Sequence, residues 1–141
     1  MLDITSELET FIKSEGENAY PNECCGVLIG KVNNEGVKTA KIAQPIHNAS
    51  EKDEQFHRFL IKPEDMIKAE SAAREVKLDV IGFYHSHPDH PALPSEYDKD
   101  HALPFYSYVI VSIEKGNAKE LTSWELTIDR KEFLQEKINK E

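Results

Sequence analysis

Residues 78–98 read LDVIGFYHSHPDHPALPSEYD, and the fold that the sequence predicts is organised around this stretch. Residues 78–84 form a near-continuous apolar run, which is typical of a strand buried on both faces at the centre of a sheet. The run ends in polar residues that include His85, His87 and His90. Three prolines lie in the loop that follows, and each fixes one backbone angle, so this loop is expected to hold a single shape.

Helical and extended patterns alternate along the rest of the chain, without an internal repeat, a low-complexity segment or a linker. We therefore expect a single α/β domain over residues 1–141, in which a mixed, mainly antiparallel β-sheet is packed by helices. The expected elements are an N-terminal helix with Ile4, Leu8, Phe11 and Ile12 on its buried face, strands at 25–29 and 37–46 joined by a turn at 33–36, a strand at 56–61, a helix from Pro63 with Met66, Ala69, Ala73 and Val76 on one face, strands at 106–113 and 119–128, and a charged helix over 129–141.

The composition is that of a folded, acidic domain. Hydrophobic residues make up 39% of the chain, charged residues 30%, and the formal net charge is −9. A surface of this charge repels phosphate backbones and anionic membranes, so neither nucleic acid nor a membrane is expected as a partner. No apolar run is long enough to span a bilayer, and the first residues lack a signal-peptide pattern. We therefore expect a cytoplasmic protein, whose adjacent Cys24 and Cys25 form no disulfide framework.

His85 and His87 form the strongest candidate for a functional pair. Side chains two residues apart on an extended chain point to the same face, so both imidazoles can aim at one point in space. Zinc binds imidazole nitrogen readily, and three protein ligands would leave the open position that catalytic zinc keeps for water. Asp98 is the natural third ligand.

Each of these motifs also has a plainer interpretation. Ser95-x-x-Asp98 is close to a helix capping box, in which Ser95 caps the helix and Asp98 reaches back to a backbone N–H. The two histidines of an isolated His-x-His pair are often only solvated loop residues. The combination favours a site, because His85-x-His87 leaves a buried strand and the Ser-x-x-Asp motif follows after seven residues.

The remaining candidate residues are expected to serve the fold or to lie in solvent. His90 is interpreted as a solvated loop residue, and His101 as a neighbour of the site on the same helix face as Asp98. Cys25 is expected to be a small buried residue at the head of its strand. Asn48-Ala49-Ser50 matches a glycosylation acceptor, which carries no weight in a cytoplasmic chain.

The ordered set His85-x-His87, seven residues, and Ser95-x-x-Asp98 resembles the signature of the JAMM metalloproteases, which are the catalytic members of the MPN domain family. The family motif also contains a glutamate upstream, near the start of an early strand. Glu23 is the matching position, in the stretch PNECCGVLIG. The resemblance implies a single MPN-type domain, with the cytidine-deaminase-like arrangement of sheet and helices.

The resemblance also implies a role for each of these residues. His85, His87 and Asp98 would hold Zn²⁺, and the metal would lower the pKa of a bound water towards neutrality. Glu23 would act as general base and later pass the proton to the leaving amine. Ser95 would donate a hydrogen bond to the oxyanion of the tetrahedral intermediate, a contact worth about 3–4 kcal/mol in comparable sites.

By the same resemblance, the expected substrate is the C-terminal tail of a ubiquitin-like or sulfur-carrier protein. The chain has no long insertion around the catalytic loop, which resembles small prokaryotic members that hydrolyse the bond after a C-terminal Gly-Gly and can release cysteine. A sheet edge beside the zinc is expected to hold the tail as an added strand. The alternatives are an isopeptidase that removes a ubiquitin-like modifier from lysine, and a non-catalytic MPN scaffold.

A zinc deaminase is a further enzyme alternative. Its signature is His-x-Glu followed by Pro-Cys-x-x-Cys. In this chain the motif at His85 lacks the glutamate and the cysteines are adjacent, so the sequence argues against deaminase chemistry. A scaffold is also disfavoured, because scaffold members of the MPN family have lost metal ligands and this chain keeps every position of the motif.

Overall fold

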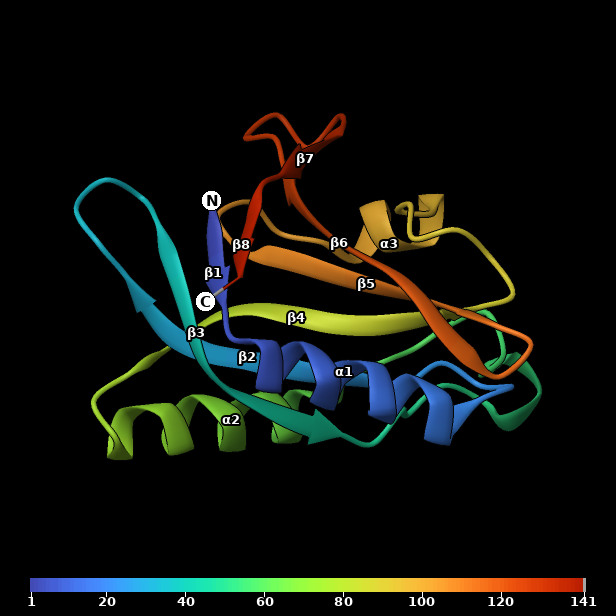
Figure 1. Cartoon of the computed structure of the whole chain (residues 1–141). Helices are drawn as coiled ribbons and strands as arrows, with labels where there is room; N and C mark the ends of the chain where they lie inside the picture. The colour runs from blue at the N-terminus through green and yellow to red at the C-terminus, as the bar shows by residue number, and fades with distance from the viewer. Residues whose placement is uncertain (141) are drawn as a thin grey trace.

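The computed structural model describes residues 1–140, which form one mixed sheet packed by helices (Figure 1). Along the sheet the strands follow the order β7-β6-β5-β4-β2-β3-β1-β8. Of the seven neighbouring pairs in this part of the chain, four are antiparallel, so the predicted mixed, mainly antiparallel α/β fold is confirmed. The elements are β1 (Leu2–Ile4), α1 (Ser6–Ala19), β2 (Cys25–Val32), β3 (Lys38–Ile46), a 3₁₀ helix (Lys52–Glu54), α2 (Pro63–Glu75), β4 (Asp79–Pro88), α3 (Glu96–His101), β5 (Ser107–Glu114), β6 (Asn117–Leu126), β7 (Phe133–Glu136) and β8 (Ile138–Lys140).

The central strand is β4, whose first part is the apolar run that the sequence analysis places at residues 78–84. It pairs with β2 in antiparallel fashion on one side and with β5 in parallel on the other (Figure 1). The strand continues to Pro88, past the predicted apolar run, and so includes both His85 and His87. The sheet edges are β7 and β8. β2 pairs with β4 only as far as Cys25 opposite His85, so the binding of a tail as an added strand beside His87 stays a prediction.

Side chains on β4 alternate between the two faces of the sheet. Tyr84 belongs to the apolar cluster that also contains residues of α1, and Ser86 approaches Gly16 of that helix. A Cβ atom at Gly16 would lie 3.2 Å from Ser86 Cβ, so glycine at this position lets α1 pack closely against β4. His85 and His87 therefore project from the opposite face, on which α2 packs against β2 and β4.

Two apolar clusters fill the space between the sheet and the two longer helices. On β2, Leu28 points into the cluster beneath α1, while Val27 and Ile29 point into the cluster beneath α2. From α2, Ala69 and Ala73 complete the second cluster. Full burial of one Val, Leu or Ile side chain favours folding by about 1.5–3 kcal/mol, so these clusters anchor the strands that carry the site.

Two predicted elements are wrong. Residues 129–140 contain strands β7 and β8 instead of a charged helix, and residue 141 lies outside the described part. The buried Glu136 carboxylate accepts hydrogen bonds from Ser107 and Ser123, and such tertiary contacts override the local preference of a charged segment. Residues 56–61 form no strand, because their backbone groups bond within the loop.

The helical faces are confirmed only in part. Ile4 lies in β1 rather than in the first helix, and Phe11 is 38% exposed, so Leu8 and Ile12 carry the buried side of α1. On the second helix, Val76 follows the last helical residue and is 53% exposed. Among residues 1–140, no helix has both the length and the apolar character needed to cross a bilayer.

Candidate metal centre

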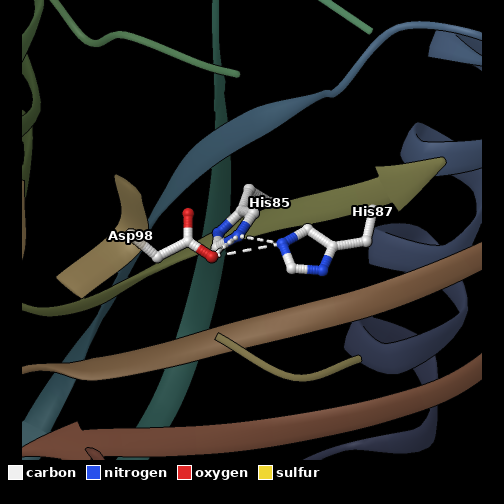
Figure 2. A group of neighbouring side chains, drawn as sticks. All are labelled: His85, His87 and Asp98. Atoms are coloured by element: carbon white, nitrogen blue, oxygen red, sulfur yellow. Dashed lines mark hydrogen bonds and ion pairs between the residues drawn. The ribbon is translucent and has the colours of Figure 1, made fainter. Parts of the chain in front are cut away.

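Two nitrogen atoms and one oxygen atom converge near the end of β4 (Figure 2). Asp98 Oδ2 lies 3.2 Å from His85 Nε2 and 3.2 Å from His87 Nε2, and the two Nε2 atoms are 3.1 Å apart. The histidines come from one face of β4, and Asp98 comes from the first turn of α3. All three side chains are almost completely buried. We call His85, His87 and Asp98 the metal triangle. Within residues 1–140 they are the only group of three or more metal-ligand side chains whose donor atoms all lie within 4.8 Å of one another.

The metal triangle has nearly the size that a tetrahedral zinc site requires. Nitrogen and oxygen ligands lie about 2.0–2.1 Å from zinc, so the edges of the ligand tetrahedron measure about 3.3–3.4 Å. The three separations in this structure are within about 0.3 Å of that value. Two imidazoles and one carboxylate also form a donor set that catalytic zinc sites use with one position open. The residues therefore fit a zinc ion.

The two imidazoles of the metal triangle have different outer contacts. His87 Nδ1 lies 2.9 Å from the Pro91 carbonyl oxygen, to which it can donate a hydrogen bond, and Nε2 is the atom that faces the triangle. His85 Nδ1 is buried and has no hydrogen-bond partner. The His85 ring instead stacks on Phe59, with centroids 4.5 Å apart and an interplanar angle of 25°. A hydrogen bond therefore orients His87, and an aromatic contact orients His85.

The loop of residues 88–94, between β4 and α3, is held by side chains from two other strands. Ser112 on β5 and Thr122 on β6 each donate a hydrogen bond of 2.6 Å to a loop carbonyl, one on either side of Pro91. The Pro91 carbonyl lies between these two contacts and accepts the hydrogen bond of His87. Strands β5 and β6 therefore fix the group that orients one candidate ligand.

Asp98 is held by the contacts that begin α3. Ser95 Oγ accepts a hydrogen bond of 3.0 Å from the Asp98 N–H, and Asp98 Oδ2 accepts one of 2.9 Å from the Ser95 N–H. The predicted capping box is therefore confirmed, and the carboxylate that caps the helix also completes the metal triangle. Burial raises the pKa of Asp98, but the imidazoles of His85 and His87 and the Ser95 N–H outweigh burial and hold that pKa well below its ordinary value.

Glu23 lies beside the metal triangle because of the register of the sheet. Cys25 on β2 is opposite His85 on β4, and this antiparallel register, extended by two residues, places Glu23 opposite His87. Glu23 is 5% exposed, and its Oε1 atom has no hydrogen-bond partner. Burial raises the pKa of Glu23 to about 8, against a smaller opposing effect of His87. A buried, unpartnered carboxylate with a raised pKa is typical of a group that exchanges protons.

The raised pKa of Glu23 predicts how the metal-free protein responds to pH. The unfolded glutamate titrates at 4.5 and the folded one at about 8, so between these values folding takes up a proton and the free energy of unfolding falls as the pH rises. Glu23→Gln removes this titration. Its melting temperature in a chelator is expected to exceed that of the wild type by a margin that grows from about pH 5 to about pH 8 and is then constant. A margin that does not change with pH would contradict the raised pKa.

Two hollows meet the metal triangle from different sides. A cleft of about 280 Å³ is lined by the two predicted catalytic residues, Glu23 and Ser95, and by one predicted metal ligand, His87. A more apolar cavity of about 340 Å³ reaches His85 and Asp98 and is lined by residues of α2 and α3. The cleft is therefore the place where a substrate could meet all the groups that hydrolysis requires.

Most other candidate residues lie where the sequence indicates. His90 is exposed in the loop, His101 is exposed on α3, and Cys25 is buried at the head of β2. Sequence reasoning missed Asn48, which is 8% exposed and donates a hydrogen bond to the Glu23 carbonyl. An asparagine within a polar loop carries no local signal of such a contact.

Comparisons with known proteins indicate the family of this chain. A family model described as prokaryotic homologs of the JAB domain matches residues 6–127. The desampylase of Haloferax volcanii is 34% identical over 93 residues, and that of Pyrococcus furiosus is 32% identical over 97 residues. The two alignments cover 65% and 69% of this chain, and 63% and 64% of the relatives. The chain therefore matches less than two thirds of the length of each relative.

Solved structures share the fold. A solution structure of a protein from Desulfitobacterium hafniense matches with a TM-score of 0.86 at 26% identity, over 100% of this chain and 93% of that chain. The crystal structure of a JAB1/MPN domain protein from Archaeoglobus fulgidus matches with a TM-score of 0.56 at 18% identity, over 99% of this chain and 97% of that chain. At this identity the second match shows the fold alone.

Proposed function

The chain belongs to the family of prokaryotic homologs of the JAB domain, and we propose that it is a zinc-dependent hydrolase of amide bonds. One observation carries the proposal. Three buried ligand atoms lie within 3.2 Å of one another, and the buried, unpartnered carboxylate of Glu23 shares a cleft with one of these ligands. Hydrolysis by an activated water needs this combination of a metal site and a base.

In this proposal His85, His87 and Asp98 hold the zinc. Their donor atoms are close enough to share one ion, and the contacts with Pro91 and Ser95 keep two of the three side chains in place. When bound, zinc supplies a Lewis acid and a water of lowered pKa. The Asp98 carboxylate offsets part of the positive charge, while the neutral imidazoles present their Nε2 atoms.

Glu23 is the proton carrier. As a carboxylate it accepts a proton from the attacking water, and as a carboxylic acid it gives this proton to the leaving amine. Burial raises its pKa, and a cation in the metal triangle draws that pKa down again, so the group is suited to both halves of the task. Oε1 has no hydrogen-bond partner in the protein, so no protein donor occupies the atom that is to accept the proton.

Ser95 is the oxyanion donor. Its Oγ atom accepts the capping hydrogen bond from the Asp98 N–H, but a hydroxyl also has one proton to donate. Ser95 lines the cleft together with Glu23 and His87, so this proton can point towards a bound carbonyl group. One residue therefore begins α3, positions a ligand and stabilises the charge that develops on the carbonyl oxygen.

The proposed substrate is the Gly-Gly tail of a ubiquitin-like protein. The cleft is small, about 280 Å³, so it suits a tail without bulky side chains. Two relatives that are similar to this chain are named desampylases, and these relatives support a ubiquitin-like partner. The bond to be cleaved is the amide after Gly-Gly, either to a cysteine that follows it in a sulfur-carrier protein or to a lysine side chain. The similarity to the two desampylases is consistent with an isopeptidase, which would cleave the lysine linkage.

We also propose that the protein works in the cytoplasm, as its sequence predicts. Cys24 and Cys25 are free and buried in the structure. Free thiols are the usual state in a reducing compartment, in which disulfides are rare.

Intact-mass spectrometry of two substrates tests the proposed function. Both use the same ubiquitin-like carrier: one ends in Gly-Gly followed by cysteine, and the other has Gly-Gly joined to the lysine side chain of a peptide. With zinc present, at least one substrate is expected to lose the group beyond Gly-Gly, and excess chelator is expected to stop this loss. Loss from neither substrate would contradict the hydrolase and favour the non-catalytic MPN scaffold. The faster reaction distinguishes a peptidase from an isopeptidase.

A further inference from the structure

The side chain of Asn48 uses every hydrogen-bonding position that it has. Asn48 lies between β3 and α2 and is 8% exposed. Its Nδ2 atom donates to the Glu23 carbonyl at 3.1 Å and to the Arg58 carbonyl at 2.9 Å. Its Oδ1 atom accepts from the N–H groups of Ser50 at 3.0 Å and Leu60 at 3.1 Å. A side-chain amide has two donors and two acceptor positions, so all four are occupied.

The backbone of Glu23 depends on the loop of residues 47–62. β2 begins only at Cys25, so Glu23 lies ahead of the strand. The Glu23 N–H donates to the Gln55 carbonyl at 2.7 Å, and the Glu23 carbonyl accepts from Asn48. Gln55 belongs to the same network, because its Nε2 atom donates to the Asn48 carbonyl at 3.3 Å. The loop therefore supplies a partner to each backbone polar group of the candidate base.

The same loop also touches the metal triangle. Phe59, which stacks on His85, is the residue before Leu60, and Asn48 holds the Leu60 N–H. The side chain of Asn48 thus lies between the backbone of Glu23 and the segment that supports a candidate metal ligand. Because this side chain is buried and fully bonded, any change in it disturbs several backbone groups at once.

We propose that Asn48 is a positioning residue for Glu23. By holding the Glu23 carbonyl, it fixes the point from which the Glu23 side chain leaves the backbone, and so the place of the unpartnered carboxylate in the cleft. The expected effect of Asn48 on the rate of hydrolysis rests on the proposed function. The hydrogen bond from Asn48 to the Glu23 carbonyl does not depend on that function. Misplacement of a catalytic group by about 1 Å can lower a rate by about 100-fold, so the contact should be visible in kcat.

Asn48→Asp removes this contact while it keeps the acceptor bonds of the side chain. A carboxylate keeps the two acceptor positions that shape the loop, and it loses the N–H donors to the carbonyls of Glu23 and Arg58. Asn48→Ala is the second variant, because it places no charge beside those carbonyls. Asn33→Asp is the matched control. Asn33 accepts two backbone N–H bonds in the turn between β2 and β3 and so organises a loop that lines neither hollow.

The kinetic test compares these variants in the wild-type and Glu23→Gln backgrounds. Both Asn48 variants are expected to lower kcat by about 10- to 100-fold with one zinc still bound, and to cause no further loss when Glu23 is already glutamine. Asn33→Asp is expected to keep the wild-type kcat. A wild-type kcat in the Asn48 variants would overturn the proposal. An equal loss in the Glu23→Gln background would also overturn it, because Asn48 would then act on the fold or the metal.

Amide hydrogen exchange tests, without a substrate, whether Asn48 holds the backbone at Glu23, whose N–H bonds to the Gln55 carbonyl of the same loop. In both Asn48 variants the Glu23 N–H is expected to exchange at least about 10-fold faster than in the wild type, while the amides of β4 keep their protection. If the wild type cleaves neither substrate, the proposed function fails, but faster exchange at Glu23 still supports the positioning role. Unchanged exchange at Glu23 overturns that role in either case.

Discussion

Glu23→Gln is expected to lower kcat/KM by about 10²- to 10⁴-fold, which is the usual contribution of a general base. The amide of glutamine has nearly the shape of the carboxylic acid, but it can neither accept the proton of the attacking water nor deliver one to the leaving amine. Zinc binding is expected to stay at one ion per chain, because Glu23 is not part of the metal triangle. Cleavage is followed by intact mass, and the zinc content by elemental analysis of the same sample.

The matched control for this prediction is Glu9→Gln. Glu9 is also a buried glutamate, but it lies on α1 and pairs with Lys13 and Lys140 instead of facing the cleft. Its replacement is expected to leave kcat/KM close to that of the wild type. A Glu23→Gln protein that keeps zinc and cleaves at the wild-type rate would remove Glu23 from the mechanism. A Glu23→Gln protein without zinc would show that Glu23 supports the metal instead.

His87→Ala is expected to abolish both stoichiometric zinc binding and catalysis. The metal supplies several kcal/mol of transition-state stabilisation, so its loss should lower kcat/KM on the order of 10³-fold or more. Binding to the folded state alone also stabilises the fold. Zinc at about 100 times its Kd is expected to raise the free energy of unfolding of the wild type by about 2.7 kcal/mol, and to leave that of His87→Ala unchanged. Denaturant unfolding with and without zinc measures this difference.

His47→Ala is the control for the loss of a histidine. His47 is exposed and lines neither the cleft nor the apolar cavity, so its removal should change neither zinc binding nor the zinc-dependent gain in stability. If zinc stabilised His87→Ala as much as the wild type, the ion would have to bind outside the metal triangle. If both variants lost zinc, the effect would not be specific to the triangle.

The parts of the site that the sequence predicts are those encoded by local patterns. An apolar run that ends in His85-x-His87 places two imidazoles on one strand face, because side chains on a strand alternate. Ser95-x-x-Asp98 is a local capping motif, and the structure contains both of its hydrogen bonds. The position of Glu23 depends instead on which strands pair. Only the resemblance to a family motif indicated it, since the register of β2 against β4 is not visible in sequence spacing.

The failures of prediction have the opposite origin. Residues 133–140 are charged and favour a helix locally, but pairing with β6 and β1 makes them strands. The segment 56–61 is rich in aromatic and aliphatic residues, as strands are, yet the side chain of Asn48 binds the Leu60 N–H and keeps the segment in the loop. In both cases partners distant in sequence decide the structure. The contacts of Asn48 with Glu23, Arg58 and Leu60 were not visible for the same reason, because these partners lie at least 10 residues away in the sequence.

The most direct test of the central claim is anomalous scattering at the zinc absorption edge from crystals of the wild-type protein grown with zinc. The account predicts one strong anomalous peak, within bonding distance of His85 Nε2, His87 Nε2 and Asp98 Oδ2, about 2.0–2.2 Å from each. The Glu23 carboxylate should face the same cleft without being a ligand. The absence of a peak at these three atoms, or a peak bound by other histidines alone, would contradict the account.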